Sequence, residues 1–153
     1  MTSLTEQNWP RADFSRVPYG AFLDSDLHAL EQQRIFRGPV WNFLCLEAEI
    51  PNAGDYKTTI VGETPVVVVR AGDGGLHAFV NRCAHRGTLL VRTTFGNTTD
   101  FTCIYHHWCY DLEGNLIGVP FLRGLKGKGG MPAEFAMADH GLQTLAVDTY
   151  AGV

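Results

Sequence analysis

The sequence predicts a mainly β fold of small antiparallel sheets, with a minor helical part near the N-terminus. Short runs rich in β-branched residues, such as "YKTTIVG" (56–62) and "PVVVVR" (65–70), are typical of strands. The 17 glycines favour turns and short strands over long helices. One stretch, residues 25–37, instead carries the leucine spacing of an amphipathic helix.

The N-terminal part is expected to be an arm followed by that helix. Residues 1–22 are polar, contain prolines, and predict an extended arm. Asp24 or Ser25 can cap the start of the helix, and the pair Gly38-Pro39 ends it. We therefore expect residues 1–40 to form the arm and helix, and residues 41–153 to form the main domain.

The remaining sequence predicts strands joined by tight turns. "VWNFLCLEAEI" (40–50) alternates loosely and predicts a strand, as does "TDFTCI" (99–104). Residues 65–81 predict a hairpin around "AGDGG", and residues 109–120 a second hairpin around "EGN". "RGLKGKGGMP" (123–132) predicts a glycine-rich, basic loop.

Composition excludes several classes of function. A formal net charge of -4 argues against nucleic acid, because phosphate binding requires a basic face. The longest aliphatic run, residues 66–69, is far shorter than the roughly 20 residues of a membrane span. The first residues lack the apolar segment of a secretory signal, so the expected location is the cytoplasm, where cysteines stay reduced.

Two short motifs place cysteine and histidine side chains together. Cys83 and His85 form C-x-H in "NRCAHRG", and Cys103 and His106 form C-x-x-H in "CIYHHWCY". Each motif follows a predicted strand and lies on a loop. Reduced cysteines are more often metal ligands or catalysts than disulfides, so we expect both loops to close around one metal centre.

The spacing leaves two kinds of metal centre open. A single zinc ion would take two cysteines and two histidines tetrahedrally, and the chain would then be a zinc-stabilised interaction module. Zinc motifs of this kind usually keep like ligands together, whereas each loop here offers one cysteine and one histidine. The mixed order favours a Rieske [2Fe-2S] cluster, in which two cysteines bind one iron and two histidines bind the other.

The residues around these motifs resemble those of a known family. "CAHRG" together with C-x-Y-H-x-W-x-Y resembles the Rieske motif at the N-terminus of the large (α) subunit of aromatic ring-hydroxylating dioxygenases. The likeness runs over residues 20–145 and includes "YDLEGNLIGVPF" after the second motif. The tail "GKGGMPAEF" is similar to that of members acting on ortho-substituted benzoates such as anthranilate or salicylate.

This resemblance implies a Rieske-type antiparallel β-sheet domain with cluster-binding loops. The implied [2Fe-2S] cluster would receive electrons from a ferredoxin or a flavin/iron-sulfur reductase. It would pass them to a mononuclear non-haem iron that hydroxylates an aromatic acid. A full-length subunit is expected to form a homotrimer or an α3β3 assembly, without nucleic acid or membrane. The implied cluster ligands are Cys83, His85, Cys103 and His106.

The mononuclear Fe(II) site itself is not expected in this chain. Such a site takes two histidines and one carboxylate, and after His106 the sequence offers only His107 and His140. We therefore expect the catalytic domain to be absent, no catalytic residue to be present, and the chain alone not to turn over substrate. The alternative is a free-standing Rieske ferredoxin, which would not need the N-terminal arm and helix.

The other residues near the motifs have less specific expectations. Cys45 and Cys109 lack a partner at ligand spacing and are expected to pack. His107 stands where many members of the resembled family carry a small residue, and is not expected to be a ligand. Compared with respiratory Rieske proteins, the resemblance implies fewer hydrogen bonds to sulfur and hence a low reduction potential. Three aromatic residues are expected to pack over the cluster: Tyr105, Trp108 and Tyr110.

Overall fold

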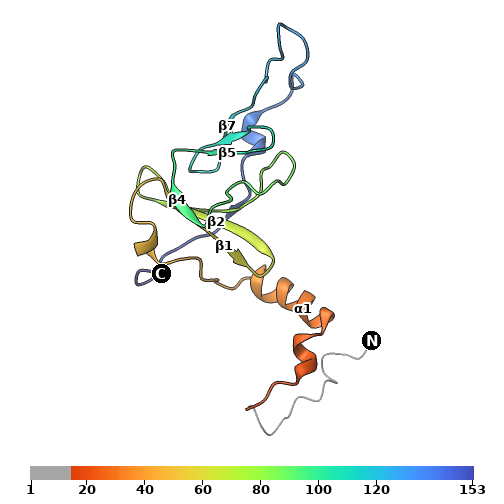
Figure 1. Ribbon diagram of the computed structural model, residues 1–153, viewed down its shortest axis with the longest axis vertical. Helices are drawn as coiled ribbons and strands as arrows, with labels where there is room; N and C mark the ends of the chain where they lie inside the picture. The colour runs from red at the N-terminus through yellow and green to blue at the C-terminus, as the bar shows by residue number, and fades with distance from the viewer. Residues whose placement is uncertain (1–14) are drawn as a thin grey trace. The chain divides into compact units, whose positions relative to one another are not determined.

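A computed structural model describes residues 15–153, and the chain divides into two compact units, Met1–Asn42 and Phe43–Val153 (Figure 1). Most of the expected arm lies outside the described residues. In the described part of the arm, Tyr19–Phe22 form a 3-10 helix (η1), so the prediction of an extended backbone is wrong for these residues. Pro18 enters this turn with its φ at -58°, and its carbonyl accepts the N–H of Ala21 at 3.0 Å.

The expected helix forms in the first unit, but its last turn is wider than an α-helix. The α-helix α1 covers Ser25–Glu31, and the Asp24 carboxylate caps it by accepting the N–H groups of Asp26 and Leu27. The chain continues as a π-helical segment (η2), Gln32–Phe36, which ends before Gly38. Among residues 15–153, no helix combines the length and apolar content that a membrane crossing demands.

The predicted strand over residues 40–50 is wrong. Residues 41–46 pair with no strand, and Glu47–Glu49 form a 3-10 turn (η3). The Glu49 carboxylate accepts the N–H of Leu46 at 2.9 Å, which closes the turn locally. The loose alternation reflects single residues such as Cys45 and Leu44 packing on a sheet face rather than a ladder of their own.

The second unit is built on a five-stranded antiparallel sheet with the order β4-β1-β2-β3-β8. The predicted runs form β1 (Asp55–Val61), β2 (Thr64–Arg70) and β3 (Leu76–Val80), and the hairpin over residues 65–81 is confirmed. Two short edge strands were not predicted, β4 (Phe95–Asn97) and β8 (Thr144–Leu145).

A three-stranded antiparallel sheet follows, with the order β5-β6-β7. Its strands are β5 (Phe101–Thr102), β6 (Cys109–Tyr110) and β7 (Leu116–Gly118), and the short 3-10 helix η4 (Met137–His140) comes later. The predicted hairpin around "EGN" is confirmed. Gly114 has a φ of 86°, and a Cβ there would lie 2.4 Å from Cε1 of Phe79. Both the positive φ and the close contact therefore require glycine.

The core lies on both faces of β2. Val66–Val69 are at most 1% exposed, which explains the unbroken valine run. Val67 and Val69 belong to one buried cluster with Phe79, with residues of the second sheet such as Tyr110, and with the motif cysteines Cys83 and Cys103. The opposite face packs Val68 and Ala78 against Cys45 and Ile50. The two cysteines of the motifs are therefore part of the main hydrophobic core.

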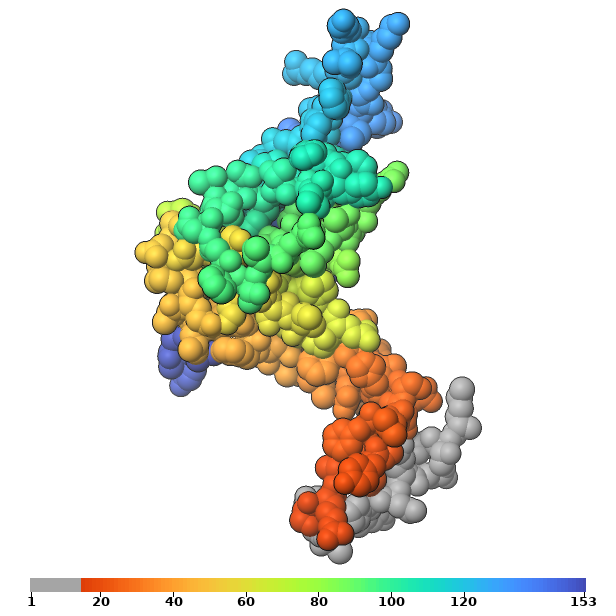
Figure 2. All heavy atoms as spheres, in the orientation of Figure 1, coloured from red at the N-terminus to blue at the C-terminus, as the bar shows by residue number. Residues whose placement is uncertain are grey.

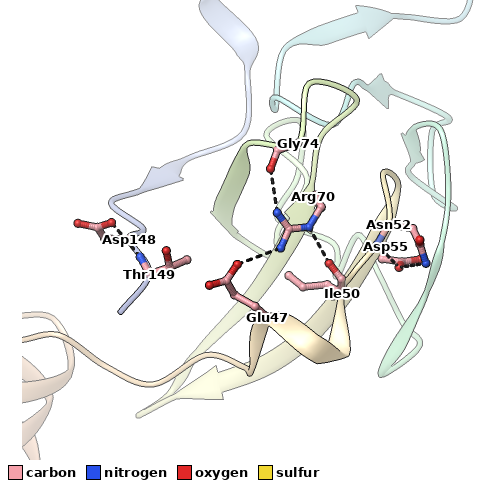
Figure 3. Close-up of polar contacts among 8 residues, drawn as sticks. All are labelled: Glu47, Ile50, Asn52, Asp55, Arg70, Gly74, Asp148 and Thr149. Carbon is pink, nitrogen blue, oxygen red and sulfur yellow. Dashed lines mark hydrogen bonds and ion pairs between the residues drawn. The ribbon is translucent and has the colours of Figure 1, made fainter. Parts of the chain in front are cut away.

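Arg70 ties the turn η3 to the β2–β3 hairpin (Figure 3). Its Nε donates to the carbonyl of Ile50 at 2.8 Å, and Nη1 donates to the carbonyl of Gly74 at 2.8 Å. Nη2 lies 3.4 Å from Oε2 of Glu47. One planar guanidinium thus satisfies two backbone carbonyls and one carboxylate, a geometry that an ammonium group does not reproduce.

We expect Arg70→Met to lower the free energy of unfolding by about 1–2 kcal/mol, because the part-buried carbonyl contact at Ile50 and the exposed one at Gly74 both lose a charged donor. Urea unfolding of the purified protein measures this. Lys57→Met is the matched control, since the Lys57 ammonium forms an ion pair with the exposed Glu49 carboxylate, and it should change stability little. Equal losses in the two variants would contradict the role given to Arg70.

Candidate metal centre

The C-x-H motif lies on a tight loop that follows β3. The N–H of Gly87 donates to the carbonyl of Cys83 at 2.8 Å, and the N–H of Cys83 donates to the carbonyl of Thr88 at 2.9 Å. Gly87 has a left-handed φ of 68°. At the base, the buried Asn81 amide donates to the carbonyl of Val91 and accepts its N–H, both at 2.8 Å, which fixes the width of the loop.

The C-x-x-H motif, between β5 and β6, repeats the same backbone. The N–H of His107 donates to the carbonyl of Cys103 at 2.9 Å, and the N–H of Cys103 donates to the carbonyl of Trp108 at 2.8 Å. His107 has a φ of 56° and occupies the position that Gly87 holds in the first loop. The two cysteines therefore begin equivalent turns, although the histidines follow them at different spacings.

His107 sits in a backbone conformation that costs an L-residue about 1–2 kcal/mol. We expect His107→Gly to raise the free energy of unfolding by about 0.5–1 kcal/mol, after the greater entropy of glycine in the unfolded chain is subtracted. Urea unfolding checks this. Gly87→Ala is the converse control, since its Cβ would meet open space and only the φ of 68° opposes it. A stabilised Gly87→Ala would contradict the backbone argument.

The two motif cysteines lie side by side in the core. Cys83 is 3% exposed and Cys103 is 1% exposed. Burial raises the pKa of Cys83, and the neighbouring Cys103 thiol raises it further, against a lowering by the Tyr110 hydroxyl. The Cys83 thiol therefore stays protonated unless a cation replaces its proton, and a bound metal would make it a thiolate.

The two motif histidines face each other at the ends of the loops. The ring centroids of His85 and His106 are 4.6 Å apart. The indole of Trp108 stacks on His85 at 4.6 Å with an interplanar angle of 9°, which holds that ring in place. Within residues 15–153, Nδ1 of His85 is the buried side-chain nitrogen or oxygen left without a hydrogen-bond partner. Burial, then His106 and Arg86, lower the pKa of His85, so its ring favours the neutral form.

These features fit a two-iron cluster. A neutral imidazole whose buried ring nitrogen has no hydrogen-bond partner can bind a metal ion through that nitrogen. Each loop contributes one cysteine and one histidine, and across the two loops thiol lies beside thiol and imidazole beside imidazole. A Rieske cluster requires this arrangement.

Tyr110 is a site residue that the sequence reasoning treated only as a packing aromatic. It is fully buried, and its hydroxyl lies 3.2 Å from Sγ of Cys83 and accepts the N–H of Ala84 at 3.1 Å. The hydroxyl proton is thus free to point at the sulfur. The available signal was position: Tyr110 is on β6, directly after the second loop, and a buried tyrosine hydroxyl needs a partner.

The two remaining cysteines lie apart from the four motif side chains, and the remaining ring residues pack around the motif histidines. Cys45 packs in the second core cluster. The Cys109 thiol donates to the Asp100 carboxylate at 3.2 Å rather than turning to the other cysteines. His140 packs against Phe135, with ring centroids 4.4 Å apart, and against Trp108. Tyr105 covers His106, with ring centroids 3.7 Å apart, which agrees with the expected packing over the site.

Comparison with known proteins decides the family. Residues 40–132 match the family described as the Rieske [2Fe-2S] domain. The chain belongs to this family. It is a Rieske domain of the type found at the N-terminus of ring-hydroxylating oxygenase large subunits, and the resemblance stated from sequence is confirmed. The [2Fe-2S] cluster predicted from the mixed ligand order is the cofactor of this family.

Curated relatives are similar to this Rieske domain along nearly its whole length. The large subunit of anthranilate 1,2-dioxygenase from Burkholderia cepacia is 57% identical, over 97% of this chain and 35% of the relative. Subunit alpha 2 of the terminal oxygenase component of terephthalate 1,2-dioxygenase from Comamonas is 52% identical, over 95% and 35% respectively. The large oxygenase component of salicylate 5-hydroxylase from Ralstonia is 47% identical, over 96% and 36%.

Solved structures confirm the predicted fold class. A mutant naphthalene 1,2-dioxygenase bound to phenanthrene matches with a TM-score of 0.77 and 36% identity, over 84% of this chain and 28% of that one. A quaternary ammonium Rieske monooxygenase matches with a TM-score of 0.76 and 28% identity, over 90% and 36%. This chain thus spans about a third of the length of the curated relatives it matches.

Proposed function

We propose that this Rieske domain is the electron-transfer part of an aromatic ring-hydroxylating dioxygenase large subunit. Cys83 and Cys103 would hold one iron of the cluster, and His85 and His106 the other. The observation that carries this assignment is the buried, unpartnered Nδ1 of His85 beside the His106 ring, on loops whose cysteines meet in the core. A Rieske cluster, when bound, accepts and donates one electron at a time.

The side chains around these ligands support that role. Burial of both cysteines excludes water from the thiolate side, where a charged sulfur would otherwise be solvated. Trp108 fixes the plane of His85, and Tyr105 covers His106. The histidine side lies closer to solvent, because both histidines are only half-buried. Electrons would therefore enter and leave along the histidine edge rather than through the core.

The activity of the whole protein is a further part of this proposal. Relatives named for anthranilate, terephthalate and salicylate support hydroxylation of an aromatic acid. Anthranilate and salicylate are ortho-substituted benzoates, and these two relatives support that substrate class. That step would take place at a mononuclear Fe(II) in a separate catalytic domain. The proposed electron donor is a ferredoxin or a flavin/iron-sulfur reductase, the proposed assembly a homotrimer or α3β3, and the proposed location the cytoplasm.

The domain boundary is proposed near residue 40. We assign residues 1–40 to an arm and helix and residues 41–153 to the Rieske domain. The division of the chain into compact units after Asn42 and the family match from residue 40 support this boundary.

Spectroscopy of the purified protein tests the proposal. We expect a brown-red protein with a rhombic EPR signal after reduction, and two irons and two acid-labile sulfides per chain, as a [2Fe-2S] cluster requires. A colourless, folded protein that binds one zinc ion would overturn it. Reduction with dithionite should proceed without any aromatic substrate, because the proposed role of this chain ends at electron transfer.

A further inference from the structure

We propose that His140 is a positioning residue for the cluster. Together with Phe135 it holds the Trp108 indole against His85, and so fixes the plane of that proposed ligand. The inference rests on the proposed function, in which His85 binds iron. It goes beyond that function because His140 belongs to neither ligand motif and lies in a later turn of the chain, η4.

Four rings form one continuous series of contacts that begins at His85. The Trp108 indole stacks on His85, with centroids 4.6 Å apart and an interplanar angle of 9°. The rings of Phe135 and His140 each meet Trp108 in a T-shaped contact, with both centroid distances at 5.8 Å and interplanar angles of 73° and 75°. Phe135 and His140 in turn lie 4.4 Å apart. Trp108 therefore contacts His85 on one face and a pair of touching rings elsewhere on its surface.

The plane of the His85 ring depends on such contacts. A metal-bound imidazole is usually oriented by hydrogen bonds to the surrounding protein. Among residues 15–153, the buried Nδ1 of His85 has no hydrogen-bond partner, so its ring contacts with Trp108 and His106 orient it. Trp108 is 3% exposed, and aromatic pairs at these distances and angles are favourable. Whatever holds Trp108 in place therefore also holds His85.

The His140 ring is itself oriented by a polar contact within its own turn. Its Nδ1 lies 2.9 Å from the carbonyl oxygen of Ala136, and because a carbonyl oxygen only accepts, Nδ1 carries the proton. The N–H of Leu142, just after this turn, donates to the carbonyl of Gly114 at 2.8 Å, which ties η4 to the β6–β7 turn. An imidazole at position 140 thus has both a ring for Trp108 and a donor that sets the angle of that ring.

Attachment of the neighbouring loop is the competing role for these side chains. Residues 121–130 project beyond the sheets of their unit (Figure 2), and the chain then returns to the main core cluster at Phe135 and η4. If His140 only attached this segment, any comparable loss of packing there would have the same effect. Met137 provides the comparison, since it lies in the same turn and packs on the same cluster but has no ring to contact Trp108.

Pulsed EPR of the dithionite-reduced holoprotein tests the proposal. Each coordinated imidazole nitrogen gives its own hyperfine coupling, whose size depends on the orientation of the ring. We expect His140→Ala to raise the fraction of clusters with a displaced ring about two- to tenfold, the factor that corresponds to losing one aromatic pair. One of the two nitrogen couplings should spread, because Trp108 stacks on His85 and not on His106. The iron content should not change, since all four proposed ligands remain.

Three further variants separate the ring, the hydrogen bond and the packing. His140→Asn keeps a donor at the position of Nδ1 but loses the ring, and should match His140→Ala. His140→Phe keeps a ring but loses the donor to Ala136, so its coupling should spread less than in His140→Ala and more than in the wild type. Met137→Ala should leave both nitrogen couplings as in the wild type, although it removes packing from the same turn.

Two results would overturn the proposal while leaving the cluster assignment intact. One is a His140→Ala protein that keeps its iron and shows both nitrogen couplings unchanged. The other is a Met137→Ala protein whose couplings spread as much as those of His140→Ala. If His140→Ala did not fold, an unchanged spectrum of His140→Phe would overturn the proposal in its place. A reduced wild-type protein without the rhombic EPR signal would instead refute the proposed function itself.

Discussion

Replacing Cys103 with serine is expected to give a colourless protein that binds no iron. The Cys103 side chain is 1% exposed, and serine would leave a hydroxyl that does not ionise to bind iron as a thiolate does. The same loss is expected for Cys83→Ser, His85→Ala and His106→Ala, because the four ligands are needed together. Iron and acid-labile sulfide analysis, with the visible spectrum, measures the outcome.

The other two cysteines provide matched controls for this prediction. Cys45→Ser and Cys109→Ser should retain iron and colour, since Cys45 packs in the second core cluster and Cys109 is bonded to Asp100. His107→Ala is the corresponding control for the histidines. Loss of iron in Cys109→Ser, with the fold intact by circular dichroism, would show that the ligand set is misassigned.

The strands that sequence predicted well are those buried on both faces or closed by a strong turn. The unbroken valine run of β2 is typical of a central strand, and the turn residues "EGN" are typical of a tight hairpin. The edge strands β4 and β8 escaped prediction because each is only three or two residues long, and pairing with a neighbour alone defines them. The strand predicted over residues 40–50 had apolar residues in loose alternation, but residues 41–46 have no neighbouring strand with which to pair.

The candidate site was predictable where chemistry depends on residue type and spacing. The four proposed ligands follow from two motifs, and the structure brings their side chains together in pairs. Two features of the site are visible only in the three-dimensional structure. The equivalence of Gly87 and His107 is a property of φ and of two backbone hydrogen bonds, which no motif reveals. The hydroxyl of Tyr110 reaches Cys83 from 27 positions away in the sequence.

Tyr110→Phe is expected to lower the reduction potential of the cluster by about 40–90 mV. The tyrosine hydroxyl lies 3.2 Å from Sγ of Cys83. Burial, and then the adjacent Cys83, raise the pKa of Tyr110 well above its usual range, so the hydroxyl keeps the proton that it donates. A donor to sulfur stabilises the more negative, reduced cluster by about 1–2 kcal/mol, which for one electron corresponds to that shift.

This hydrogen bond is one that the reasoning from sequence did not count. The expected low potential rests on fewer donors to sulfur than in respiratory Rieske proteins, and Tyr110 lies within reach of one sulfur. The potential should therefore lie above the bottom of the Rieske range, about -150 mV, and the substitution should move it down.

Redox titration followed by EPR measures the shift, and Tyr105→Phe is the control, because the Tyr105 ring packs on His106 from the exposed side. Loss of the Tyr105 hydroxyl should leave the potential unchanged. If Tyr110→Phe kept its iron and its potential, the hydroxyl would be serving the Ala84 N–H alone, and its effect would be confined to the stability of the first loop.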